Sequence, residues 1–112
     1  MKIYHNNRCS KSREGLEILK KSNQQFEIVN YLDTPPTIKE LKEILKMLGI
    51  TPIQLVRKNE SIWKEKYKDK DLDTEAIIKA MVENPKLIER PIIVKNNKAV
   101  IGRPPENIKN LL

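Results

Sequence analysis

Hydrophobic and polar residues alternate at the start of the chain and then change to a helical spacing. Lys2 to His5 alternates and predicts a short strand. Two leucines recur at helical spacing after it, and Ser10 or Ser12 is expected to cap this helix. Phe26 to Tyr31, FEIVNY, is β-branched and aromatic, which favours a second strand. Strand, helix and strand within about 30 residues predict a βαβ unit with parallel strands.

The middle of the chain carries three stretches with helical signals. Thr37 and Glu40 fit a capping box, and apolar residues at helical spacing lead from them to Gly49. Gly49 is expected to end this helix in the left-handed conformation. A second, short helix is expected from position 51 to about 57, where proline stands at the first helical position. A third is expected from 73 or 74 to about 84, with a proline just past its end.

The C-terminal part predicts a hairpin followed by a helix. Ile92 to Lys95 and Ala99 to Ile101 are expected to be strands around Asn96-Asn97, whose residues tolerate positive φ. Pro104-Pro105 begins the last helix. The order βαβ, three helices and ββα predicts an α/β, thioredoxin-like fold with a three-helix insert, at about residues 37–84, between the second and third strands.

Length and composition limit the possible classes of protein. The chain has 112 residues, 38% hydrophobic and 33% charged, which is typical of one globular domain over residues 1–112. No apolar run approaches the roughly 20 residues that span a bilayer, and the N-terminus lacks the apolar stretch of a secretory signal. A single cysteine forms no intramolecular disulfide and gives no sign of an oxidising compartment. We therefore expect a cytoplasmic protein without a membrane partner.

The net charge of +7 does not by itself identify a partner. Aromatic residues make up only 4% of the chain, which leaves few platforms on which nucleic-acid bases stack. The lysines are spread along amphipathic segments, which is typical of a solvated basic surface. No nucleic-acid partner is expected.

The only cysteine, Cys9, lies where the first strand ends and the next helix begins, among Arg8, Lys11 and Arg13. Helix N-termini and nearby cations lower the pKa of a thiol to about 3.5–7.5, and the thiolate is the reactive form. The alternative is a buried, inert cysteine, although such residues usually lie in apolar surroundings. The sequence therefore favours a reactive thiol.

Two more side chains near the thiol are candidates for the same site. His5 either adds a hydrogen bond or a charge there or is an ordinary histidine at the end of a strand. Ser12 is placed to donate a hydrogen bond to the sulfur. The motif CSKS has no second cysteine, so any disulfide at Cys9 must involve another molecule. One cysteine and one histidine leave no zinc site, and no metal is expected.

Three arginines at strand and helix boundaries, Arg57, Arg90 and Arg103, complete the candidate chemistry. Each alone is typical of a surface salt bridge. In a thioredoxin-like fold, however, the loops before the third strand and before the last helix border the first βα turn. Guanidinium groups bind tetrahedral oxyanions through paired hydrogen bonds that lysine does not reproduce. A thiolate beside several arginines favours nucleophilic attack on an oxyanion.

Five motifs are similar, in this order and across essentially all of the chain, to those of the ArsC-type arsenate reductase family: HN-x-x-CSKSR, YLDTPPT, LGI-x-P-x-x-L-x-RKNE, NPKLIERPI-x-V and IGRPPE. The resemblance implies reduction of arsenate to arsenite, coupled to glutathione as co-substrate and to glutaredoxin, with no bound cofactor. It places the nucleophile on Cys9, the nearby histidine on His5 and the anion-binding arginines on Arg57, Arg90 and Arg103.

The resemblance also carries an expectation about the backbone and one departure. Thioredoxin-like folds place a cis-proline before the third strand, which implies a cis peptide at Arg90-Pro91. Asn7 stands where the family commonly has proline, which implies a looser turn but leaves the catalytic set unchanged.

Two functions from other classes fit parts of the same sequence. A general glutathione-dependent thiol oxidoreductase needs Cys9 but tolerates the loss of the arginines. An Spx-like regulator binds RNA polymerase and usually carries a C-x-x-C redox switch. Ser12 stands at the position of the second cysteine of that motif. This argues against a redox switch in this chain but not against binding to RNA polymerase.

Overall fold

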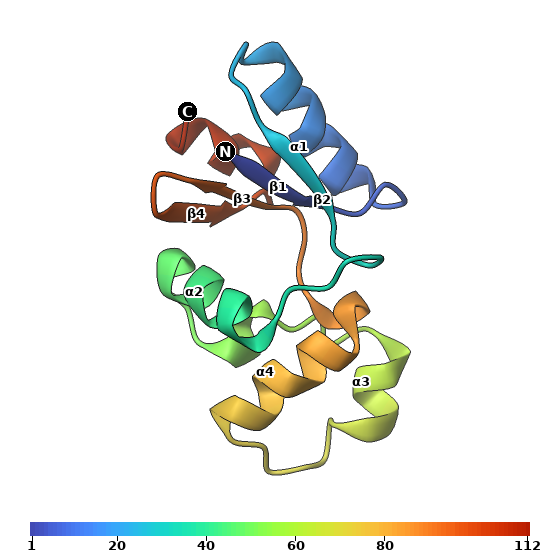
Figure 1. The fold of residues 1–112 in the computed structure, drawn as a ribbon. Helices are drawn as coiled ribbons and strands as arrows, with labels where there is room; N and C mark the ends of the chain where they lie inside the picture. Colours follow the sequence, from blue (N-terminus) through green and yellow to red (C-terminus); the bar gives the residue numbers. More distant parts are fainter. The chain divides into compact units, whose positions relative to one another are not determined.

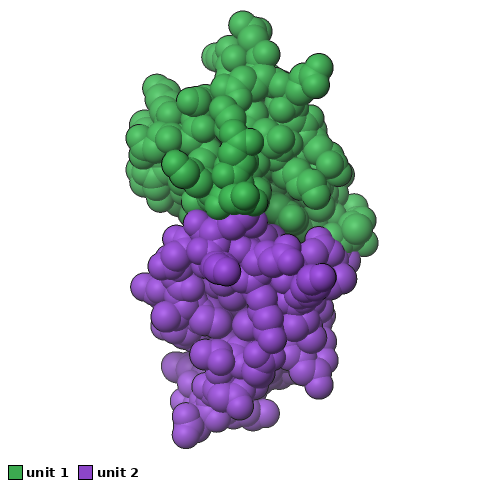
Figure 2. All heavy atoms as spheres, turned by 60° about the vertical axis from the view of Figure 1, so that its left-hand side comes forward, with its two compact units in different colours: residues 1–34, 90–112 green, residues 35–89 purple.

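The computed structural model describes all 112 residues and divides into two compact units (Figure 2). Unit 1 joins residues 1–34 to residues 90–112, and unit 2 consists of residues 35–89. Unit 2 therefore interrupts unit 1 between its second and third strands, where the sequence predicts a helical insert. The single domain expected over residues 1–112 stays a prediction.

Unit 1 contains a four-stranded mixed sheet with the strand order β2-β1-β3-β4 (Figure 1). Its elements are β1 (Lys2–His5), α1 (Ser10–Lys21), β2 (Glu27–Asn30), β3 (Ile92–Lys95), β4 (Lys98–Ile101) and the 3-10 helix η3 (Pro105–Asn110). β1 and β2 are parallel, whereas β3 is antiparallel to both β1 and β4. The predicted βαβ unit and the hairpin are thus confirmed.

The core of unit 1 forms where the sheet, α1 and η3 pack together. One residue from each of four elements is fully buried there: Ile3, Leu19, Ile93 and Ile108. Two glycines allow close approach to Pro91, because a Cβ on Gly15 would lie 3.0 Å, and one on Gly102 2.8 Å, from Cγ of that proline. A methyl group at Gly102 would force its neighbours to shift, and one at Gly15 would be tighter than an ordinary contact, so the packing favours glycine at both positions.

The backbone of unit 1 confirms two local predictions. Asn96 and Asn97 turn the β3–β4 hairpin with φ of 51° and 63°. The peptide bond between Arg90 and Pro91 is cis, as the resemblance implies. A second cis bond joins Arg103 to Pro104, which the sequence did not predict.

The elements of unit 2 are all helices (Figure 1). Its elements are α2 (Ile38–Leu48), the 3-10 helix η1 (Pro52–Leu55), α3 (Ser61–Lys66), α4 (Thr74–Glu83) and the 3-10 helix η2 (Pro85–Leu87). The predicted capping box is confirmed, since Oγ1 of Thr37 accepts from the amide of Glu40 at 3.1 Å and the Glu40 carboxylate accepts from the amide of Thr37 at 3.4 Å. Gly49 ends α2 with a φ of 69°, also as predicted. Asp73 caps α4.

Four details differ from the sequence-based expectations. The sequence does not predict α3, because Trp63 is its one buried residue and a single buried position gives no periodicity. The helix expected over 51–57 is a shorter 3-10 helix, and the last helix is also of the 3-10 type. The prediction that Ser10 or Ser12 caps α1 is wrong, since Cys9 is the N-cap residue.

Candidate active site

Cys9 follows the loop that leaves β1 and is the N-cap residue of α1. Its amide donates to the carbonyl oxygen of Asn6 at 3.0 Å, and its carbonyl oxygen accepts from the amide of Arg13 at 3.0 Å. These bonds hold the thiol at the start of the helix, where free N–H groups and the helix dipole favour a negative charge. The residue is 8% exposed and is therefore largely buried.

Two arginines from the C-terminal segment of unit 1 meet at this thiol. Arg103 donates from Nη2 to Sγ of Cys9 at 3.4 Å and from Nε to the carbonyl oxygen of Arg90 at 2.8 Å. Each arginine directly precedes one of the two cis-prolines. The side chain of Arg90 also forms a hydrogen bond with the thiol, so the structure brings together three of the predicted site residues, one thiol and two guanidinium groups.

The surroundings lower the pKa of the Cys9 thiol below that of an ordinary cysteine. Burial alone raises this pKa, because it disfavours the charged thiolate. Hydrogen bonds from the backbone amides of Ser12 and Lys11, together with the hydrogen bond and positive charge of Arg90, outweigh that effect. The net result is a larger thiolate fraction near neutral pH, which is what a nucleophile requires.

His5 and Ser12 form a buried hydrogen-bonded pair that contacts the loop leading to Cys9. Nδ1 of His5 lies 2.7 Å from Oγ of Ser12, and the same oxygen accepts from the amide of Asn6 at 3.0 Å. The hydroxyl of Ser12 therefore holds the histidine and the loop, and its action on the sulfur comes through its backbone amide. The expected bond from the hydroxyl to the sulfur is replaced by this arrangement.

The pKa of His5 lies below its ordinary value. Burial is the main cause, and hydrogen bonds with Asn7 and Ser12 oppose it only in part, while the charges of Arg13 and Lys20 lower the pKa further. The imidazole is therefore neutral at pH 7. A neutral ring has one protonated and one unprotonated nitrogen, and the direction of the 2.7 Å hydrogen bond between Nδ1 and the Ser12 hydroxyl is set by which nitrogen holds the proton.

Arg57 belongs to unit 2, just after η1. Its Nη1 lies 3.0 Å from a carboxylate oxygen of Glu89, and its Nε lies 3.4 Å from one of Glu60. All three side chains are partly buried, which makes these ion pairs less exposed to solvent than typical surface pairs. The structure thus shows Arg57 held by two carboxylates within unit 2, and its role toward an oxyanion stays a prediction.

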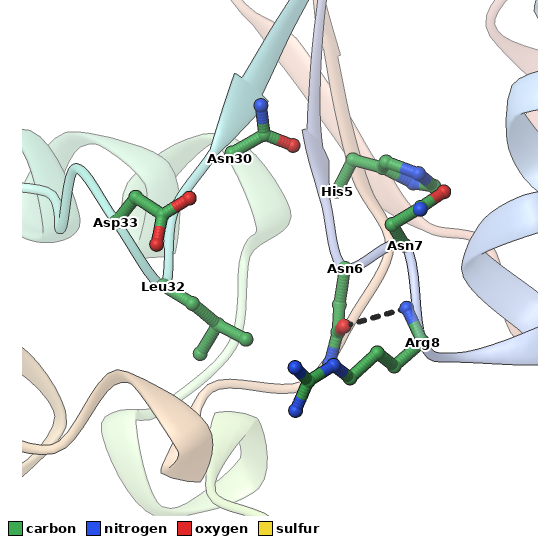
Figure 3. A pocket seen from close by; sticks show the side chains of 7 residues that line it. All are labelled: His5, Asn6, Asn7, Arg8, Asn30, Leu32 and Asp33. Atoms are coloured by element: carbon green, nitrogen blue, oxygen red, sulfur yellow. Dashed lines mark hydrogen bonds between the residues drawn. The ribbon is translucent and has the colours of Figure 1, made fainter.

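A pocket of about 270 Å³ in unit 1 contains residues that the sequence reasoning did not single out as a site. Figure 3 shows its two sides, one from the loop after β1 and one from the turn after β2. The lining residues are His5, Asn6, Asn7, Arg8, Asn30, Leu32 and Asp33. The available signal was the predicted βαβ unit, because ligands of open α/β sheets bind outside the carboxyl ends of parallel strands.

Two other kinds of feature are missing from the structure. No group of three or more histidine, cysteine, aspartate or glutamate side chains is arranged to hold a metal ion. None of the helices combines the length and the apolar character that crossing a membrane would take.

Comparison with known proteins decides the family. Residues 4–111 match the sequence model of the ArsC family. The chain belongs to this family. This ArsC-family protein is 50% identical to the uncharacterized protein YfgD of Escherichia coli, with all of this chain and 96% of the relative aligned. It is 44% identical to an arsenate reductase of Neisseria meningitidis, over all of this chain and 97% of that one.

A solved structure gives the same result for the fold of this ArsC-family protein. The arsenate reductase from Vibrio cholerae superimposes with a TM-score of 0.93 at 42% identity, covering 100% of this chain and 98% of that one. The family resemblance and the thioredoxin-like fold with a helical insert, both expected from the sequence, are confirmed.

Proposed function

We propose that this protein reduces arsenate to arsenite with Cys9 as the nucleophile. The observation that carries the proposal is the contact between the guanidinium of Arg103 and the sulfur of Cys9, at a thiol whose pKa is lowered. A guanidinium group in this place can bind an oxyanion and stabilise the charge that develops as the thiolate attacks. Relatives that carry the name arsenate reductase, at 42–44% identity, support the choice of arsenate.

The first steps form two bonds to arsenic. The thiolate of Cys9 attacks arsenic and forms an S–As bond, while one arsenate oxygen takes up protons and leaves as water. Arg90 and Arg103, with Arg57 as the third predicted arginine, bind the remaining oxygens. The thiol of glutathione then forms a second S–As bond, and a second oxygen leaves as water.

The two electrons come from thiols outside the chain, because Cys9 is its only cysteine. A glutaredoxin thiolate attacks the sulfur of the bound glutathione, and the electron pair of the broken S–As bond stays on arsenic. Arsenic becomes trivalent, and glutathione and glutaredoxin form a mixed disulfide. Water then displaces Cys9 and arsenite leaves. This scheme needs no bound cofactor and fits a reducing compartment, the cytoplasm.

The decisive experiment measures arsenite release by the pure protein with arsenate, glutathione and glutaredoxin. The parent protein is expected to release arsenite in repeated turnovers. Cys9→Ser is expected to release none, because a hydroxyl is a poor nucleophile near neutral pH and cannot form the mixed adduct. Ser10→Ala, which changes the neighbouring exposed residue, is the matched control. Turnover of a glutathione mixed disulfide without any arsenite release would instead support the general thiol oxidoreductase.

A further inference from the structure

The pocket after β1 and β2 lies at the same edge of the sheet as the loop that leads to Cys9. β1 and β2 are parallel and paired from Lys2–Glu27 to His5–Asn30, so their carboxyl ends meet at this edge. The loop after β1 supplies one side of the pocket, and the turn after β2 supplies the other (Figure 3). Arg8, on the first side, directly precedes the nucleophile. The loop that lines the pocket is therefore the same loop that holds the nucleophile, since the Cys9 amide donates to the carbonyl oxygen of Asn6 at 3.0 Å.

Hydrogen bonds fix both sides of this pocket. In the first loop, the amide of Arg8 donates to Oδ1 of Asn6 at 3.0 Å, and Nη1 of Arg13 donates to the carbonyl oxygen of Asn7 at 3.0 Å. In the second turn, the amides of Asp33 and of the next residue donate to the carbonyl oxygen of Asn30 at 3.0 Å and 2.9 Å. A pocket with fixed walls binds a small ligand at a lower entropic cost than a mobile loop does.

The two sides carry opposite charges. Arg8 contributes a guanidinium group on one side, and Asp33 contributes a carboxylate on the other (Figure 3). Neither side chain forms an ion pair within the chain. Asn7 on the first side and Asn30 on the second also line the pocket and carry amide hydrogen-bond donors and acceptors (Figure 3). These groups match a small zwitterion that contains peptide bonds.

We infer that this pocket binds the thiol co-substrate, a zwitterionic thiol peptide of the glutathione type; the inference rests on the proposed function. Arg8 binds a carboxylate of the peptide, and Asp33 binds its ammonium group. The volume of about 270 Å³ is just below the range for small-molecule pockets, about 300–1,000 Å³, so the pocket holds the charged groups of the peptide rather than enclosing all of it. The bound thiol forms its S–As bond at the adduct on Cys9, and the displaced oxygen leaves as water.

The test uses S-methylglutathione, which keeps the ammonium group and both carboxylates but has no reactive thiol. Titration of isotope-labelled protein, followed by NMR, is expected to shift the amide signals of residues 6–8 and 30–33. Arg8→Gln and Asp33→Asn are each expected to raise Kd roughly two- to fivefold, the usual effect of an exposed ion pair. Lys21→Gln and Asp71→Asn remove one charge of each sign from exposed residues that do not line the pocket, and they should leave Kd unchanged.

A change in the ligand tests the assigned orientation. An S-methylglutathione analogue without the α-amino group has no partner for Asp33, so Asp33→Asn should no longer affect its Kd, whereas Arg8→Gln should still raise it. Three results each overturn the inference: unshifted pocket amides, a Kd of S-methylglutathione that either pocket substitution leaves unchanged, or an Asp33 effect that persists with the analogue.

The binding experiment is independent of the proposed reaction because it contains no arsenate. If the protein binds S-methylglutathione as described but releases no arsenite, the proposed function fails and the pocket assignment stands. If it releases arsenite but the pocket amides do not respond, the pocket assignment fails and the proposed function stands. In the full reaction, the pocket substitutions should raise KM for glutathione and leave KM for arsenate unchanged.

Discussion

Arg103 joins two parts of the candidate site, since it donates from Nη2 to Sγ of Cys9 at 3.4 Å and from Nε to the carbonyl oxygen of Arg90 at 2.8 Å. The thiol and this arginine are 94 positions apart in the sequence. The planar guanidinium makes both bonds at once because its N–H groups point in fixed, different directions. One side chain therefore fixes the backbone of the cis-proline turn and contacts the reactive sulfur.

Replacing Arg103 with lysine should separate geometry from charge. A lysine ammonium keeps the positive charge but cannot make both bonds in the fixed geometry of the guanidinium. Arsenate turnover is expected to fall about 10- to 100-fold, less than the 100- to 1000-fold typical of losing an oxyanion donor completely. Arsenite release at saturating glutathione measures the effect, with Lys109→Arg in η3 as the control. Turnover equal to that of the parent protein would contradict a geometric role for the guanidinium.

The lowered pKa of Cys9 predicts an unusual pH profile of thiol reactivity. The rate of alkylation by iodoacetamide should reach half of its plateau below about pH 8.5, the value for a free thiol. Arg90→Gln removes a hydrogen bond and a charge that favour the thiolate, so its midpoint should move upward toward that value. The same protein unfolded in urea provides the reference. A parent midpoint at or above the reference would instead support the inert, buried cysteine.

Arg57 requires a test that distinguishes substrate binding from its ion pairs in unit 2. Arg57→Lys is expected to lower arsenate turnover, because lysine loses the paired donors that bind an oxyanion. Glu89→Gln removes the shorter of the two ion pairs and leaves the arginine in place. If the ion pair alone mattered, both variants would lose activity equally. We expect Arg57→Lys to lose more activity than Glu89→Gln and to show the larger change in KM for arsenate.

The neutral, buried His5 predicts a loss of stability in mild acid. Because its pKa is lowered in the folded protein, the unfolded chain takes up a proton first as the pH falls below about 6.5. The free energy of unfolding should therefore be at its full value above this pH and decrease below it, until the folded pKa is reached. Denaturant titrations at several pH values measure this, and His5→Asn should lack the histidine part of the decrease. Parallel curves for the two proteins would refute it.

The sequence predicts well those features that depend on neighbouring residues. The Thr37–Glu40 capping box, the left-handed Gly49 and the asparagine hairpin follow from the local chemistry of a few positions, and the structure has all of them. Cys9, Arg90 and Arg103 are readable as candidates from the charge around the one cysteine and from the family motifs, and the structure brings these three together, whereas the roles of the site residues, Arg57 included, stay predictions.

Features that depend on tertiary packing could not be predicted in the same way. The Ser12 hydroxyl has several possible partners, and only the fold places the His5 ring 2.7 Å from it. The cis bond before Pro104 is one of two isomers that the sequence permits. The pocket formed by Arg8 and Asp33 requires the register of two paired strands, which the composition of either segment does not specify.

Gly102→Ala tests whether the packing around Pro91 supports the thiol site. The added Cβ would lie 2.8 Å from Cγ of Pro91 and 3.1 Å from Cδ1 of Ile108, and the proline ring cannot rotate away. Overpacking of this kind should reduce the free energy of unfolding by about 1–3 kcal/mol, measured by denaturant titration. Because the next residue is Arg103, the shift should also disturb its bond to Cys9 and raise the midpoint of thiol alkylation. Asn110→Ala, at an exposed position of η3, should change neither quantity. An unchanged alkylation midpoint in a destabilised Gly102→Ala protein would show that the thiol site does not depend on this packing.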